Sequence, residues 1–544
     1  MDRRESIKTL LLGTASLPFI SRGKHSGSES PAGKPAEPMH SRWEEWPDMQ
    51  WAGPQYWANR LQDWRIVDGW AECSVSAPNR SLHCLTHQLA ESEGTIEMQA
   101  EVELLNPGHA EGIQIGFRIG ARAQGRPVRV SFDDYRRNAV FGEGLHAGID
   151  GKGRLFIGEE TAGGAIPLKD RIQLQLKAHP DGKQYRLTLS AWSVANKREL
   201  GRLTVQGIKP EQLTGNVALL SHFPLTLQDT ETPSARFSSW RLSGSKVEQH
   251  AGRTFGPICF AQYTLDRGIL KMTAQLTPVE AVSGHKVELQ IQREGHWVTV
   301  DETTVHPLAR TVHFRIEEWS SKEQTPYRVR LELPLKGRTE EYFYEGSFAA
   351  EPGAEEELKM AVFSCNSHYG FPNDEVVQNV AKHNPDIAMF LGDQIYESHG
   401  GFGAERTKDV EKATLDYLRK WYMFGWSYRD IFRNIPAGFI PDDHDVFHGN
   451  IWGQGGDKAS TNEGWGYQAQ DKGGYKYPAE WVRMVERTLT SHLPDPYDPT
   501  PVKQDIGVYY TDWTYGGVSL AIIEDRKFKT APQNALPKEA EVQN

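Results

Sequence analysis

Apolar and polar residues alternate with a period of two over much of the first 350 residues, which is typical of β-strands with one buried face. Residues 95–104, TIEMQAEVEL, place five apolar side chains on one face: Ile96, Met98, Ala100, Val102 and Leu104. Two further alternating runs, RIQLQLKAH and KQYRLTLSAW, are joined by Pro-Asp-Gly at residues 180–182, which favours a hairpin turn. Many such strands predict a two-sheet β-sandwich for residues 41–246.

A second β segment follows at residues 254–350. The runs KVELQIQ, TVHFRIEEW and PYRVRLELPL alternate cleanly, and the length fits one immunoglobulin- or fibronectin-like sandwich. The acidic stretch EPGAEEE at residues 351–357 is typical of a linker. Nothing in this segment suggests chemistry.

After the linker the pattern changes to alternating strands and helices. Continuous apolar strands are predicted in LKMAVFSC, PDIAMFLGDQIY and AGFIPDDHD, the first of them buried on both faces. A short helix is expected over residues 373–384, and a long amphipathic stretch covers residues 405–424. This alternation predicts an α/β domain over residues 358–544.

Each of these three strands ends in polar residues. The carboxyl ends of parallel strands meet at one edge of a sheet, so we expect five side chains to converge there: Cys365, Asp393, Tyr396, Asp443 and His444. Taken singly, such residues are more often a turn aspartate, a buried cysteine or a packing histidine. The stretch IPDDHDVFHGNIWG at residues 440–453 crowds carboxylates that repel one another unless a cation lies among them. We therefore interpret Asp442, Asp443 and Asp445 as carboxylates offset by bound metal.

The motifs FSCNSH, LGDQIYE and IPDDHDV, in this order, resemble the alkaline phosphatase D (PhoD-like) family of calcineurin-like metallophosphoesterases. The resemblance covers residues 359–529. It implies Fe3+ and Ca2+ as cofactors, with Cys365, Asp393 and Tyr396 on the iron side and Asp443 on the second metal; other divalent metals are possible. It further implies that His444 acts on the phosphoryl oxygen. A thiolate and a phenolate suit iron better than magnesium or calcium.

The sequence departs from this family pattern in two places. After IPDDHDV, the amide ligand is either Asn450, one position late, or is replaced by His448. The late Gly-Asp-x-His element of the superfamily is missing after the apparent buried strand VSLAIIED. By resemblance, a sizeable C-terminal part of the catalytic domain is expected to be absent, through a truncated gene, a fragment or completion by a second chain.

Composition narrows the function classes. The formal net charge of −11 indicates no broad basic surface for nucleic acid or an anionic membrane. The count of 16 Trp fits either a sugar-binding cleft or, as we favour, core packing. Cys73 and Cys84 are spaced so that a hairpin disulfide is permitted but not required.

The N-terminus is typical of an export signal followed by a flexible tether, residues 1–40. Arg3, Arg4 and Lys8 precede a short apolar run and resemble a twin-arginine signal, which implies a periplasmic or secreted protein. The alternative is a chance basic N-terminus on a cytoplasmic protein. No other segment is apolar enough to cross a membrane.

Two functions follow from these observations. The first is an exported metal-dependent phosphoesterase that hydrolyses phosphate mono- or diesters by metal-activated hydroxide. The second is a catalytically incomplete exported β-sandwich protein that carries a phosphoesterase remnant. The stretches GWAECSVSAPNRSLHCLT and ARFSSWRLSG resemble concanavalin-like jelly rolls, so the first sandwich is either a glycan-binding domain or a spacer.

Overall fold

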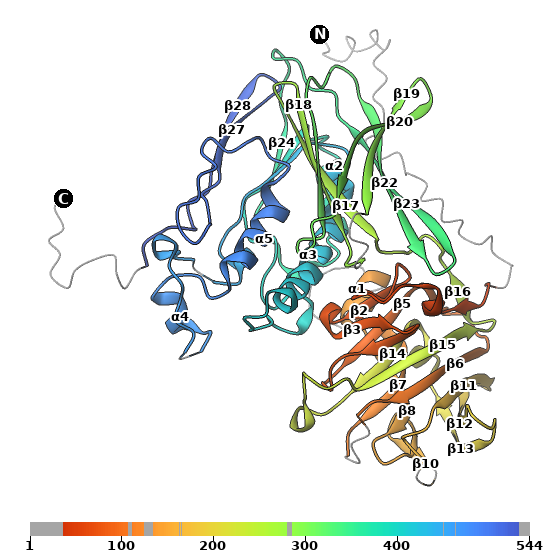
Figure 1. Ribbon diagram of the computed structural model, residues 1–544. Coiled ribbons are helices and arrows are strands. Elements are labelled where there is room, and N and C mark those ends of the chain that lie inside the picture. The colour runs from red at the N-terminus through yellow and green to blue at the C-terminus, as the bar shows by residue number, and fades with distance from the viewer. Residues whose placement is uncertain are drawn as a thin grey trace, which may run out of the picture.

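The computed structural model of the chain describes residues 36–106, 111–123, 134–162, 164, 166–279, 285–449, 451–462 and 464–531. It is a mostly β, multidomain protein (Figure 1), and its parts share one continuous apolar core. The predicted export signal, with Arg3, Arg4 and Lys8, lies outside the described residues.

The N-terminal part consists of two eight-stranded sheets in which every pairing is antiparallel. The first sheet has the order β13-β12-β11-β6-β15-β4-β3, with β1 paired to β15. Its strands are β1 (Met39–His40), β3 (Trp64–Val67), β4 (Trp70–Cys73), β6 (Ile96–Leu104), β11 (Ile172–Asp181), β12 (Gln184–Ser193), β13 (Glu199–Ile208) and β15 (Ala235–Ser243).

The second sheet has the order β10-β9-β8-β7-β14-β5-β16, with β2 paired to β5. Its strands are β2 (Tyr56–Asn59), β5 (Arg80–Leu89), β7 (Gln114–Arg122), β8 (Glu143–Asp150), β9 (Leu155–Ile157), β10 (Glu160–Ala162), β14 (Gly215–His222) and β16 (Val247–Gln249). The short helix α1 (Tyr135–Phe141) packs against β5, β7 and β14 of this sheet.

The period-two pattern predicted the strands of this part well. All five apolar residues of β6 are buried, and β11 and β12 form the predicted hairpin. The predicted option of a disulfide between Cys73 and Cys84 is wrong: both thiols are free and buried. The physical reason is that β4 and β5 belong to different sheets, so the two cysteines are not hairpin partners.

The second β part forms two smaller sheets, in the orders β17-β18-β21 and β20-β19-β22-β23. The predicted runs correspond to β19, β21 and β22. The seven strands are β17 (Ile258–Asp266), β18 (Ile269–Leu276), β19 (Lys286–Arg293), β20 (His296–Thr304), β21 (Thr311–Ile316), β22 (Thr325–Leu335) and β23 (Arg338–Phe348).

The third part contains a three-stranded parallel sheet with the order β24-β25-β26, formed by β24 (Met360–Phe363), β25 (Ile387–Phe390) and β26 (Ala437–Phe439). An antiparallel hairpin, β27 (Tyr510–Tyr515) and β28 (Val518–Ile523), follows later in the chain. The helices of this part are α2 (Asp374–Ala381), α3 (Val410–Phe432), α4 (Tyr467–Asp471) and α5 (Ala479–Thr490).

Two of the predicted buried strands are partly exposed. β25 is buried throughout, but β24 lies at the sheet edge and leaves Met360 and Val362 exposed. β28 pairs with β27 alone among the described strands, and Ile523 is 67% exposed. An apolar run alone does not distinguish a central strand from an edge strand, because strand order is set by tertiary pairing.

Helix α3 lies between the three parts (Figure 1) and is buried on nearly all sides rather than amphipathic. The ring of Trp426 lies 5.1 Å from that of Trp57 in the N-terminal sandwich. The Tyr422 hydroxyl donates to the carbonyl of Leu276 at 2.8 Å, and the Phe424 ring lies 5.4 Å from that of Phe390. This helix therefore joins the parallel sheet to both β parts.

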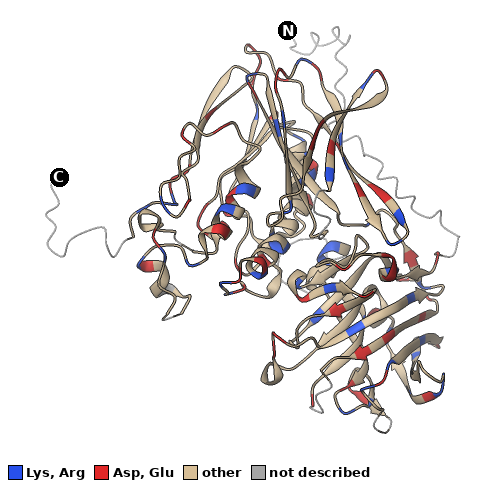
Figure 2. Cartoon of the chain, in the orientation of Figure 1, with Lys and Arg blue, Asp and Glu red and all other residues tan. Residues whose placement is uncertain are grey.

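Side-chain burial and the distribution of charge agree with what the composition predicted about Trp and about basic surfaces. None of the 16 Trp side chains is fully exposed and most are buried, which confirms core packing as their main use. Lys and Arg are interspersed with Asp and Glu over the chain (Figure 2). In the part of the chain that the structure describes, no helix combines the length and apolarity needed to span a bilayer.

Candidate metal centre

The three parallel strands end in loops that meet at one edge of the sheet. Cys365 follows β24, Asp393 follows β25, and residues 442–444 follow β26. The first two loops are joined through their backbones: the N–H of Cys365 donates to the carbonyl of Gly392 at 3.2 Å, and that of Asn366 to the carbonyl of Asp393 at 2.8 Å. The structure therefore brings the strand ends together.

The backbone at these loops takes conformations that few side chains favour. Cys365 and Asp393 have positive φ angles of 57° and 54°. Gly392 has a φ of 93°, and a Cβ there would lie 2.4 Å from the Cβ of Asp442. The glycine thus permits the close approach of the loops after β25 and β26.

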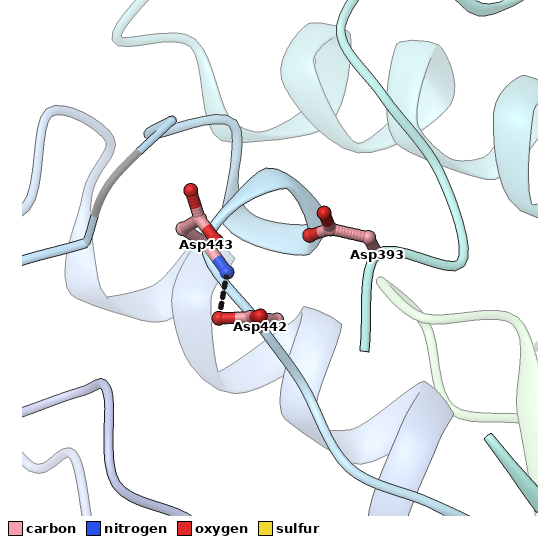
Figure 3. Close-up of side chains that lie close together, drawn as sticks. All are labelled: Asp393, Asp442 and Asp443. Atoms are coloured by element: carbon pink, nitrogen blue, oxygen red, sulfur yellow. Dashed lines mark hydrogen bonds between the residues drawn. The ribbon is translucent and has the colours of Figure 1, made fainter. Parts of the chain in front are cut away.

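Three carboxylates gather at this point. One oxygen each from Asp393, Asp442 and Asp443 lies within 4.8 Å of the others (Figure 3). The N–H of Asp443 also donates to Oδ1 of Asp442 at 2.8 Å. Burial and then the neighbouring Asp443 raise the pKa of Asp442 to about 6, while Arg526 opposes the rise. A bound cation would relieve the repulsion among these carboxylates.

A thiol and a phenol approach the same oxygen of Asp393. The Cys365 Sγ lies 3.7 Å from Oδ2, and the Tyr396 hydroxyl donates to Oδ2 at 2.9 Å. Burial, followed by the hydrogen bond to Asp393, raises the pKa of the Tyr396 phenol. Ionisation of this phenol therefore requires a compensating positive charge.

His444 lies beside the carboxylates and is held by a glutamate that the sequence did not single out. Its backbone N–H donates to Oδ1 of Asp393 at 3.3 Å, and its Nδ1 lies 2.9 Å from Oε2 of Glu397. Its Nε2 is 4.0 Å from Oδ2 of Asp443. Burial lowers the pKa of His444, but the hydrogen bond and charge of Glu397, with Asp393 and Asp443, raise it to about 9. The LGDQIYE motif contains Glu397, so its position directly after Tyr396 was a signal available in the sequence.

Asp445 accepts hydrogen bonds from the backbones of two loops. Its buried carboxylate accepts backbone N–H bonds from Asp393 at 2.9 Å, Gln394 at 3.0 Å and Asp442 at 2.9 Å. N–H donors from two loops thus occupy its oxygens, and the offset of its charge by bound metal stays a prediction. It braces the loops after β25 and β26 against each other.

The remaining predicted residues are placed as follows. Asn450, predicted as an amide ligand, lies outside the described residues. His448, its alternative, is buried, and its backbone N–H donates to the carbonyl of Asp443 at 3.1 Å. Arg526 was not predicted at this site: its Nε lies 3.1 Å from Asp442 Oδ1 and its Nη1 3.7 Å from Asp443 Oδ1. The charged residues that follow VSLAII were the available signal.

The donor set fits a centre of two cations. The Cys365 thiol and Tyr396 phenol beside one oxygen of Asp393 suit a transition metal such as iron. The carboxylates of Asp442 and Asp443 suit a hard cation such as Ca2+. Asp393 is within reach of both groups of donors and is the residue suited to bridge two ions.

Comparisons with known proteins support an assignment for this part of the chain. Residues 360–544 match the family model described as PhoD-like phosphatase. No curated protein sequence matches the chain.

Several solved structures are similar to parts of the chain. One titled "Structure of PhoD" is 17% identical, with a TM-score of 0.38, over 51% of this chain and 53% of that one; the chain thus spans about half of its length. The lectin II from Ulex europaeus is 9% identical, with a TM-score of 0.27, over 39% of this chain and 100% of the lectin. The exoplasmic/lumenal domain of VIP36 is 10% identical, with a TM-score of 0.24, over 35% and 83%. Because all three TM-scores are below 0.5, the similarity of residues 360–544 to PhoD-like phosphatases rests on the family model.

Proposed function

We propose that the chain, whose residues 360–544 match the PhoD-like phosphatase family, is a metal-dependent phosphoric ester hydrolase. The reaction takes place at the strand ends of the parallel sheet, around Asp393, Asp442 and Asp443. The observation that carries the proposal is the gathering of these three carboxylates within 4.8 Å, next to a thiol, a phenol and a histidine.

In this proposal six side chains would hold the metal ions. Cys365, Asp393 and Tyr396 would hold Fe3+, and Asp393, Asp443 and Asn450 would hold Ca2+; Asp442 joins the second set because it belongs to the same cluster. When bound, the ions supply a Lewis acid for the phosphoryl group and lower the pKa of a coordinated water. Other divalent metals with oxygen and sulfur preferences remain compatible with the donor set.

The chain's own residues then position the ester and manage its protons. His444 presents Nε2 toward the carboxylates while Glu397 holds Nδ1, so Nε2 can donate a hydrogen bond or proton to a phosphoryl or leaving-group oxygen. Glu397 is a positioning residue, because it fixes the orientation and the protonated nitrogen of the ring. Asp445 keeps the two ligand loops in register.

The direct test is hydrolysis of aryl phosphate mono- and diesters by the purified full chain supplied with Fe3+ and Ca2+. We expect turnover that a chelator abolishes and that Asp393→Asn lowers by at least about 10²-fold, as for loss of a bridging ligand. The matched control is Asp301→Asn on β20, far from the sheet edge, which should retain activity. A chain that binds metal stoichiometrically but hydrolyses neither ester class would refute the proposal.

Three further proposals concern the domains, glycan contact and export. We assign residues 41–246 as a concanavalin-like β-sandwich, 254–350 as an immunoglobulin- or fibronectin-like sandwich, and 358–544 as the α/β phosphoesterase domain. Glycan contact belongs to the first sandwich in this scheme. We also propose export to the periplasm or beyond through Arg3 and Arg4, and the double variant Arg3→Lys with Arg4→Lys should stay in the cytoplasm.

A further inference from the structure

We propose that the N-terminal β-sandwich is a fixed support of the candidate metal centre, and that Arg136 and Arg137 on its helix α1 position the loop that carries Cys365. The inference rests on the proposed function for what the centre does, but the residues it concerns lie more than two hundred positions away in the sequence. They are positioning residues and do not touch the proposed ligands themselves.

The loop needs support because its backbone is held in an unfavourable conformation. Cys365 and Asn373 begin and end it with φ angles of 57° and 60°. This left-handed conformation costs free energy at Cys365 and persists only where the surroundings specify it, whereas asparagine adopts it readily. The loop also contains a single 3-10 turn, His368–Gly370, and the carbonyls of Tyr369 and of the next residue but one, Phe371, accept hydrogen bonds from outside the loop.

Arg137 supplies both of these hydrogen bonds. Its Nη1 donates to the carbonyl of Tyr369 at 3.1 Å and to that of Phe371 at 2.9 Å. Its guanidinium lies over the ring of Phe141, 5.5 Å from the centroid, so it is fixed from the sandwich side. One cationic side chain of α1 thus holds the middle of the turn at His368–Gly370 and the residue that follows it.

Arg136 fixes the far end of the same loop. The N-cap residue Asp134 accepts from Arg136 Nε at 3.0 Å and from Nη2 at 2.8 Å, which orients the guanidinium. The same Nη2 donates at 2.5 Å to Asp374, the first residue of α2. The loop between β24 and α2 is therefore held at its middle by Arg137 and at its end by Arg136.

The contact continues from this loop to the loop after β25. The ring of Phe141 stacks on that of His368, with 5.6 Å between the ring centroids. The backbone N–H of His368 donates to Nε2 of His399 at 3.2 Å. The His399 ring lies 5.6 Å from that of Tyr396, whose hydroxyl reaches Asp393. The sandwich thus contacts the loop after β24 directly and reaches the loop after β25 through His368.

A second bridge from the sandwich reaches the same loop through α3. Gln62 donates to Oδ1 of buried Asp416 at 3.3 Å, and Oδ2 of Asp416 accepts the N–H of Glu405 at 2.9 Å. Arg60 forms an ion pair with Glu405. Arg419 of the same helix donates to the carbonyl of His399 at 2.9 Å. The two bridges leave the sandwich from different residues and meet at His399.

The test uses the full chain with Arg137→Ala, Arg136→Ala and Arg137→Lys. The matched control is Arg202→Ala on β13, where Arg202 pairs with Glu199 at the sandwich surface. The first readout is hydrogen exchange of the amides of Cys365, Asn366 and His368, which needs no metal. The second is titration with Co2+ alone, followed by the thiolate-to-cobalt absorption band that reports ligation by Cys365.

We expect Arg137→Ala to speed exchange of these amides about tenfold and to weaken Co2+ binding about tenfold, with a smaller effect of Arg136→Ala. Arg137→Lys, which keeps a donor, should recover part of both losses, and Arg202→Ala should match the wild type. Unchanged exchange in Arg137→Ala would overturn the inference whatever the metal result. Faster exchange together with no thiolate band in the wild type would uphold the support role and refute the proposed ligation by Cys365.

Discussion

His444 Nδ1 lies 2.9 Å from Oε2 of Glu397, although the two residues are 47 positions apart in the sequence. The pair joins the loop after β25 to the loop after β26, and it leaves Nε2 of the imidazole directed toward the carboxylates of the site. Under the proposed function, His444 is assigned as the proton donor and Glu397 as the residue that orients it.

His444→Ala should lower turnover of an aryl phosphate ester by about 10²-fold or more, the usual effect of losing a positioned acid or electrostatic group. Bound metal should be nearly unchanged, since the ring is not assigned as a ligand. Metal analysis of the same preparations checks this point. If the variant loses metal, His444 is a ligand and its catalytic assignment is wrong.

Glu397→Gln should lower turnover by about 10-fold, because the ring of His444 loses the partner that orients it. Since Glu397 acts through His444, the double variant with His444→Ala should be no slower than His444→Ala alone. Glu248→Gln on the sandwich surface is the control and should behave as the wild type. Additive losses in the double variant would contradict the assigned relationship.

Tyr396→Phe tests the iron assignment. The full chain loaded with Fe3+ should show a visible tyrosinate-to-iron absorption band, and this variant should lack it. Tyr428→Phe is a matched control, because the Tyr428 hydroxyl contacts Asn366 in the neighbouring loop at 3.0 Å rather than Asp393. A band that survives in Tyr396→Phe and disappears in Tyr428→Phe would move the phenolate ligand from one residue to the other.

Acid should destabilise the chain through buried neutral histidines, of which His492 is the clearest. Its Nε2 contacts the carbonyl of Ala437 at 2.7 Å, and burial lowers its pKa to about 3. Below about pH 6.5 the unfolded chain binds a proton that the folded chain does not, so stability is present above that pH and is lost as pH falls toward 3. Lowering the pH from about 6.5 to 5 therefore reduces the free energy of unfolding by about 2 kcal/mol for each such histidine.

His492→Gln keeps a donor for Ala437 but removes this titration. Denaturant unfolding of the metal-free chain at pH 7.5 and pH 5 should therefore show a smaller acid effect in the variant, by about 2 kcal/mol. The control is His296→Gln on β20, whose side chain is exposed. An identical acid effect in His492→Gln and the wild type would show that the buried ring is not the titrating group.

The pattern of apolar and polar residues predicted where strands lie in the sequence, but not how the strands pair or which residues they bring together. Alternation located β6, β11, β12 and β22, because side-chain periodicity is a local property. The edge position of β24, the burial of α3 and the contact of Arg526 with Asp442 depend on which elements pair and pack across long sequence distances. Asp445 shows the same limit within one motif: the sequence shows its carboxylate, but not the backbone N–H donors that reach it from its own loop and from the loop after β25.

Gly392→Ala tests whether the two ligand loops must approach as closely as they do. The new Cβ would lie 2.4 Å from that of Asp442, so one loop would have to move, and the φ of 93° adds strain. Over-packing and strain together should cost about 2 kcal/mol or more, and the shift should weaken metal binding at Asp393 and Asp442. Gly401→Ala separates the two effects, because Gly401 has a φ of 84° and no atom within 4 Å of the added Cβ. It should lose about 1 kcal/mol of stability and keep its metal affinity. Equal metal affinities for the two variants would mean that the contact between Gly392 and Asp442 does not shape the site.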